Sequence, residues 1–130
     1  MYQHPGKRPV FLSLWKFRFP LNAWLSAAHR LTGLILFISL IGYLALFNLM
    51  VFHERVSLAD LQQHCIIHCL NSIFWISLSY HWLSGLRHLL AEHFADHPLY
   101  STINHHNVSV ALLLTWGLAS LFIIKQAWSL

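Results

Sequence analysis

The sequence predicts an all-α integral membrane protein with three transmembrane helices and a short N-terminal segment at the membrane interface. Of its 130 residues, 57% are hydrophobic and 9% are charged, which leaves too little polar surface to cover a soluble core. Three apolar runs contain no Asp, Glu, Lys or Arg, and each approaches the roughly 20 residues that cross a bilayer as a helix. The runs are Leu31 to Phe52, Cys65 to Leu86 and Val108 to Ile124, the third being completed by residues 125–128.

The N-terminal segment, Met1 to Trp24, does not resemble a signal peptide. Three prolines interrupt it, and no short apolar core precedes a small-residue cleavage site. No internal repeat or linker divides the chain, so residues 1–130 are expected to form a single membrane-anchor domain. Three helices make a thin bundle whose polar residues need further partners, which indicates a second membrane subunit or a homo-oligomer.

Basic residues predict the orientation. Five Lys or Arg residues precede the first apolar run, whereas Arg55 alone lies in the first loop. The five are Lys7, Arg8, Lys16, Arg18 and Arg30. This asymmetry predicts a cytoplasmic N-terminus and, after three crossings, an external C-terminus. The net charge of +4 is therefore mostly a topology signal and not a nucleic-acid-binding patch.

Two histidines share a face near the end of the second apolar run. His81, Gly85 and His88 stand at i, i+4 and i+7, so they line one side of a helix over about 10 Å. An imidazole can ligate haem iron, and a glycine one turn away leaves room for the edge of a porphyrin. Arg87 and His88 could then neutralise haem propionates. Alternatively, His81 hydrogen-bonds to a neighbouring helix and Gly85 only eases helix packing.

A matching face lies at the start of the first apolar run. Ser26, Arg30 and Gly33 also stand at i, i+4 and i+7, with His29 on the flank. A hydroxyl and a guanidinium at the membrane boundary can hold a polar head group whose tail stays in lipid, which describes a quinone. The alternative is that Ser26 caps the helix N-terminus while Arg30 snorkels to phospholipid.

Two other groups contain possible metal ligands. His64, Cys65, His68 and Cys69 carry ligand types that suit zinc or copper. However, one rigid helix rarely wraps four ligands around an ion, and an intrahelical disulfide between the cysteines is unfavourable. His93 and His97 in the second loop, residues 91–107, raise the same question, although water can simply solvate them.

Several motifs in this order resemble a known family, the cytochrome b membrane-anchor subunit of succinate dehydrogenase. The resemblance runs from about Arg8 to His93 and is continued by the third apolar run. It is carried by four segments: Arg8 to Leu14 (RPVFLSL), Arg18 to Pro20 (RFP), Ser26 to Gly33 (SAAHRLTG) and His81 to His88 (HWLSGLRH).

The resemblance implies a haem b shared with a second small membrane subunit, together with an iron–sulfur subunit and a flavoprotein subunit. His81 matches the axial haem ligand, Ser26 and Arg30 match the ubiquinone site, and His29 and Arg30 match residues near the haem propionates. Such a subunit lies in the bacterial cytoplasmic (inner) membrane and helps reduce ubiquinone. Two alternatives remain: the anchor of a quinol:fumarate reductase, or a stand-alone membrane protein whose histidines move protons or a metal.

Overall fold

A computed structural model describes residues 19–53, 61 and 63–129. Within this part of the chain the secondary structure is helical and contains no strand, which confirms the all-α class. The described helices are α1 (Leu21–Phe52), α3 (Cys65–His93), the short α4 (Leu99–Ile103) and α5 (His106–Trp128).

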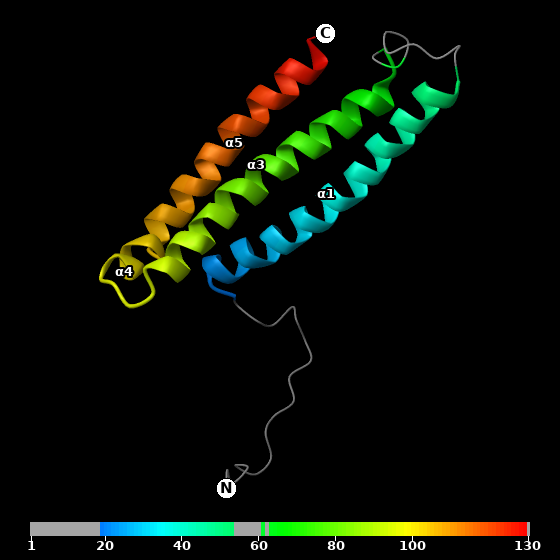
Figure 1. The fold of residues 1–130 in the computed structure, drawn as a ribbon. Coiled ribbons are helices and arrows are strands. Elements are labelled where there is room, and N and C mark those ends of the chain that lie inside the picture. The colour runs from blue at the N-terminus through cyan, green and yellow to red at the C-terminus, as the bar shows by residue number, and fades with distance from the viewer. Residues whose placement is uncertain (1–18, 54–60, 62, 130) are drawn as a thin grey trace, which may run out of the picture.

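The three long helices lie side by side, with α3 between α1 and α5 (Figure 1). Helix α3 packs along both neighbours, whereas α1 and α5 contact each other little. Consecutive long helices are antiparallel, so α1 and α5 run in the same direction. The start of α1, the end of α3, α4 and the start of α5 therefore meet at one end of the bundle, which we call the α4 end.

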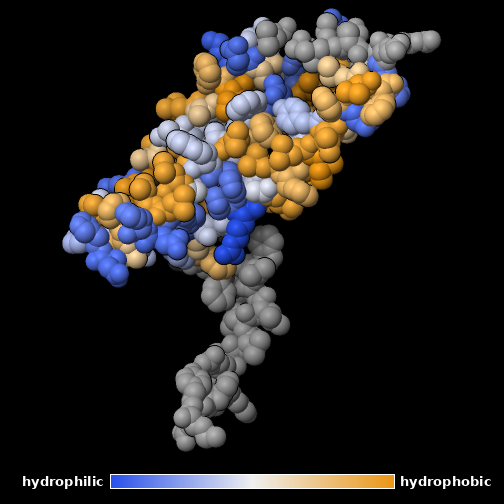
Figure 2. Space-filling model, viewed as in Figure 1, coloured by the Kyte–Doolittle hydropathy of each residue, from blue (hydrophilic) through white to orange (hydrophobic). Residues whose placement is uncertain are grey.

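The bundle is polar inside and apolar outside. Among the described residues, Leu25, Tyr80 and Ala127 are the buried hydrophobic ones, whereas large apolar side chains cover the surface of the helices. Hydrophilic residues gather at the two ends in Figure 2. Small and hydrogen-bonded residues at helix contacts, with apolar side chains facing outward, are typical of membrane bundles. The buried polar residues are Ser39, Ser72, Ser77, Ser84, Arg87 and Ser109.

Side-chain hydrogen bonds join the helices. The Tyr80 hydroxyl donates to the carbonyl oxygen of Leu25 at 3.0 Å and connects α3 to α1. The Trp116 indole donates to the carbonyl oxygen of Ile76 at 3.1 Å and connects α5 to α3. Such bonds orient helices in an environment where the hydrophobic effect contributes little to their association.

Helix α1 begins ten residues before the predicted span from Leu31, because Leu21 to Arg30 continues the same helix with Pro20 as its N-cap. Proline fits the start of a helix, since it lacks the N–H that the first turn leaves unpaired. Ser26 lies more than one turn inside α1, so the alternative that it caps this helix is wrong. Most of the predicted N-terminal segment, residues 1–18, lies outside the described residues.

Helix α3 continues to His93, beyond the predicted end at Leu86. The predicted second loop, residues 91–107, therefore contains the last turn of α3 and also α4. The polar residues of this last turn still form backbone helix bonds, so counting apolar residues alone placed the end too early. Helix α5 starts at His106, two residues before the predicted span, and the His105 side chain accepts a hydrogen bond from the Asn107 N–H.

Within the described residues, two helices, α1 and α5, are long and apolar enough to cross a membrane. Helix α3 has 29 residues, which is also sufficient length, but it carries more polar residues. The two spans agree with the first and third predicted ones, and the second stays a prediction.

Candidate functional site

Helices α1 and α3 bring three histidines together near the α4 end. The rings of His29 and His81 stack with their centroids 3.9 Å apart and their planes 13° from parallel. The ring of His88 stands edge-on to His29 at 5.4 Å. We call His29, His81 and His88 the histidine cluster. All three are partly exposed, so a group outside this chain can reach them.

The orientation of His81 is set by the backbone of α1. Its Nδ1 atom lies 3.1 Å from the carbonyl oxygen of His29 and 3.3 Å from the Thr32 hydroxyl. A carbonyl oxygen can only accept, so this contact requires the hydrogen on Nδ1. In the neutral imidazole with this hydrogen, Nε2 carries the free lone pair. A histidine that donates from one nitrogen to a carbonyl and presents the other is the usual arrangement of a metal ligand.

A serine holds His29 in place. The Nδ1 atom of His29 lies 2.8 Å from the Ser84 hydroxyl oxygen. Ser84 is buried, and its own hydrogen is directed to the carbonyl oxygen of Tyr80 at 2.8 Å. The hydroxyl therefore accepts from His29, which fixes the hydrogen of this imidazole on Nδ1 as well.

Two glycines leave room for the stacked rings of His29 and His81, each glycine for the histidine of the other helix. A Cβ atom added to Gly33 of α1 would lie 3.0 Å from Cε1 of His81, and one added to Gly85 of α3 would lie 3.2 Å from Cε1 of His29. Each helix thus offers a glycine to the histidine of the other. The His29 ring lies beside Gly85 in the described structure, and the expectation that this glycine leaves room for a porphyrin edge stays a prediction.

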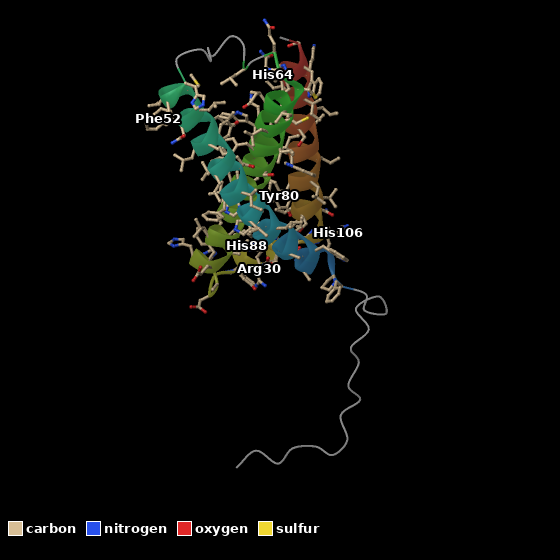
Figure 3. The ribbon with its side chains drawn as sticks, turned by 90° about the vertical axis from the view of Figure 1, so that its right-hand side faces the viewer. Arg30, Phe52, His64, Tyr80, His88 and His106 are labelled. Carbon is tan, nitrogen blue, oxygen red and sulfur yellow. The ribbon has the colours of Figure 1, made fainter. Side chains whose placement is uncertain are left out.

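Ser26 and Arg30 lie on α1 close to the histidine cluster. Ser26 is half-buried, whereas Arg30 is exposed. Figure 3 shows Arg30 of α1 and His88 of α3 at the α4 end, opposite Phe52 and His64. A hydroxyl and a cation thus stand one helical turn apart beside the cluster, and the geometry leaves the guanidinium accessible to an anionic or carbonyl oxygen.

The guanidinium of Arg87 is bound by acceptors within the chain. The residue is 7% exposed, and its guanidinium donates to Asn22 Oδ1 at 3.0 Å, to Asn104 Oδ1 at 3.1 Å and to the carbonyl oxygen of Ile103 at 3.2 Å. These bonds connect α3 to the first turn of α1 and to the connection between α4 and α5. The contact of Arg87 with a haem propionate stays a prediction.

Comparison with known proteins gives this geometry a context. Residues 5–124 match the model of the succinate dehydrogenase/fumarate reductase transmembrane subunit family. The chain is also 35% identical over 97 residues to the succinate dehydrogenase cytochrome b556 subunit of Coxiella burnetii, covering 67% of this chain and 72% of that protein. The chain belongs to the succinate dehydrogenase/fumarate reductase transmembrane subunit family. The resemblance inferred from the sequence motifs is confirmed.

The other possible metal ligands in this family member do not converge. Among the described residues, no group of three or more His, Cys, Asp or Glu side chains could hold a metal ion. Cys65 and Cys69 are free and exposed, with their sulfur atoms 3.9 Å apart. The ring of His68 instead lies 5.6 Å from that of Trp128. In the second loop, His97 accepts from the Leu99 N–H.

Some residues of the site were missed from the sequence. Asn22, Asn104 and Ser109 take part in the hydrogen bonds around Arg87, and Ser109 is fully buried with its hydroxyl 2.7 Å from Asn22 Oδ1. Asn22 and Arg87 are polar residues at the edges of apolar segments, which was a usable signal. Their pairing could not be inferred because 65 residues separate them in the chain.

Proposed function

We propose that this chain is the haem b-binding membrane anchor of a succinate:quinone oxidoreductase, which helps reduce ubiquinone with electrons from an iron–sulfur subunit. The observation that carries the proposal is the histidine cluster, in which His81 is oriented by α1 so that Nε2 is available to iron. Family membership supports the enzyme complex, and the name of the Coxiella burnetii relative, a cytochrome b556 subunit, supports haem b.

His81 is the proposed axial ligand, and the donor set around it fits a haem. Its Nδ1 donates to the His29 carbonyl oxygen, which increases the basicity of the ligating nitrogen. A second axial ligand would come from a second small membrane subunit. Bound there, the haem would supply a one-electron redox centre within the membrane.

Basic residues at the α4 end are the proposed partners of the haem propionates. Arg30 is exposed, and His29 and His88 are partly exposed, so these three can approach an anionic group without breaking a buried contact. Arg87 belongs to the same proposed set, but its three hydrogen bonds within the chain favour an indirect role.

Ser26 and Arg30 are the proposed residues of the ubiquinone site. The Ser26 hydroxyl would donate to one quinone carbonyl, and the Arg30 cation would stabilise negative charge that develops on a quinone oxygen. Quinone reduction also needs protons, and the boundary at the α4 end gives access to water as well as to an electron-carrying subunit.

The same proposal includes three membrane crossings with the α4 end in the cytoplasm of a bacterium. Helices α1 and α5 run in the same direction, so if both cross, α3 must return between them. The excess of basic residues before the first span supports a cytoplasmic N-terminus, which places the second loop on the side where the iron–sulfur and flavoprotein subunits would dock.

A stand-alone proton or metal transporter is less well supported. On α3, His68 lies near the start of the helix and the next histidine is His81, 13 residues or about 20 Å of helix further on. That distance is too long for a direct proton transfer between the two side chains. The family match spans both succinate dehydrogenases and fumarate reductases, so the fumarate-reducing direction remains the nearer alternative.

The haem assignment predicts that His81→Leu removes or strongly perturbs the low-spin haem b signal. The reduced-minus-oxidised absorbance of the purified complex measures this, with His68→Leu as the matched control. A complex that keeps its spectrum in His81→Leu and loses it in His68→Leu would place the haem near the opposite end of the bundle.

The reciprocal glycine packing predicts that Gly33→Ala disturbs the haem without removing the ligand. Its Cβ would lie 3.0 Å from the His81 ring, so the imidazole must move and the absorbance band and midpoint potential should shift. Gly117→Ala is the control, since nothing lies within 4 Å of a Cβ built there. Equal spectra in both variants would contradict the role of Gly33 in seating His81.

The quinone assignment predicts that Ser26→Ala and Arg30→Leu each lower ubiquinone reductase turnover, by ~10²-fold for loss of one donor to a developing anion. Succinate oxidation with a water-soluble dye that accepts electrons before the membrane subunits should be unchanged. Wild-type turnover at limiting quinone in both assembled variants would show that this face of α1 serves helix packing.

The topology predicts opposite labelling of the two ends of α3. In a Cys65→Ser/Cys69→Ser background, cysteines replacing Gln63 and Asp96, both exposed, should react with a membrane-impermeant maleimide from opposite sides. Asp96→Cys should be reached from the cytoplasm. Labelling of both from one side would mean that α3 does not cross.

A further inference from the structure

The most deeply buried charge in the described part of the chain is the Arg87 guanidinium, at 7% exposure. All three of its acceptors are neutral amide oxygens, on Asn22, Asn104 and Ile103. Burying a cation among neutral groups costs free energy. The planar guanidinium donates in several fixed directions at once, so it can hold several segments in one arrangement.

The network around Arg87 closes on Asn22. The Asn22 side-chain oxygen accepts from Arg87 and from the buried Ser109 hydroxyl, at 3.0 and 2.7 Å. Its amide nitrogen donates to the carbonyl oxygen of Asn104 at 3.1 Å. The first turn of α1 is therefore fixed to α3, to α5 and to the connection before α5. We call Asn22, Arg87, Asn104 and Ser109 the polar lock.

A second contact fixes α1 one turn further on, where the Tyr80 hydroxyl donates to the Leu25 carbonyl oxygen. Ser26 follows this point directly and lies one turn after Asn22, and Arg30 lies one turn beyond Ser26. Because a helix is rigid over such a distance, its depth and rotation at Asn22 determine where Ser26 and Arg30 stand. The polar lock thus determines the geometry of the proposed quinone site without touching the quinone.

We propose that Arg87 is a positioning residue for quinone binding: through Asn22 it sets the depth and rotation of α1 that let Ser26 and Arg30 engage one quinone head group. This inference rests on the proposed quinone site. It differs from a role of Arg87 as a counter-charge to a haem propionate, because a positioning role depends on the shape of the guanidinium and on Asn22, whereas a counter-charge role depends on charge alone.

The test uses the assembled complex and steady-state kinetics with a short-chain ubiquinone. We expect Arg87→Met and Asn22→Leu each to raise the KM for quinone about tenfold, the size of a lost charge-assisted hydrogen bond, with dye-linked succinate oxidation unchanged. Arg87→Lys should not restore the KM, since one ammonium group cannot reproduce the fixed directions in which the guanidinium donates to its three acceptors. Asn22→Asp keeps the acceptor for Arg87 and Ser109 but loses the donor to the Asn104 carbonyl oxygen, so it should raise the KM less than Asn22→Leu does.

Two measurements distinguish a positioning role of Arg87 from a counter-charge role. The double variant Arg87→Met/Asn22→Leu should resemble either single variant if the two residues act as a unit, whereas Lys125→Met, which removes an exposed cation of α5, should match wild type. A shift of the haem potential in Arg87→Met that Arg87→Lys reverses, with an unchanged quinone KM, would overturn the proposal in favour of a counter-charge.

Loss of assembly in all four single variants of Arg87 and Asn22 would also overturn it, because Arg87 would then serve folding alone. Failure of the quinone site itself is recognised separately. If Ser26→Ala and Arg30→Leu retain wild-type quinone kinetics, the site is wrong, and if only those two are impaired, the positioning role of Arg87 is wrong.

Discussion

The reciprocal packing of two histidines against two glycines is the constraint on which the rest of the site depends. Because Gly33 and Gly85 have no side chains, the rings of His81 and His29 fit beside them, and α1 and α3 come close enough for the His29 carbonyl oxygen to reach His81 Nδ1. That single bond decides which nitrogen of His81 is available. A larger residue at either glycine would separate the helices and release the imidazole from its orientation.

Polar contacts hold the helices of this bundle together, whereas apolar packing has that role in a soluble protein. The largest apolar side chains face outward, and serines, an arginine and a tyrosine fill the contacts between helices. In lipid an apolar residue gains little by turning inward, so hydrogen bonds such as those of Tyr80 and Trp116 determine helix orientation. The histidine cluster is therefore held by directional bonds on both sides, which suits a site that must present one nitrogen in a defined direction.

The sequence was sufficient to locate the helices, but not to locate their ends or to show which residues of different helices contact each other. Apolar runs located α1, α3 and α5, yet α1 starts at Leu21 and α3 ends at His93, because polar residues continue each helix beyond its apolar run. Periodicity placed His81 and Gly85 on one face. It could not show that His29 fills the space beside Gly85, since that contact joins residues distant in the chain and depends on the rotation of both helices.

The same limit explains why Arg87 was assigned to a ligand from the sequence, whereas the structure surrounds it with Asn22, Asn104 and Ile103. An arginine beside a histidine at a membrane boundary is chemically suited to a propionate, and spacing along one helix cannot reveal a competing acceptor on another. Burial distinguishes the two arginines: Arg30 of α1 is exposed, whereas Arg87 of α3 is buried. Under the proposed function the two residues have different roles, because the exposed guanidinium of Arg30 can contact the substrate, whereas the buried guanidinium of Arg87, with its neutral partners, connects the helices.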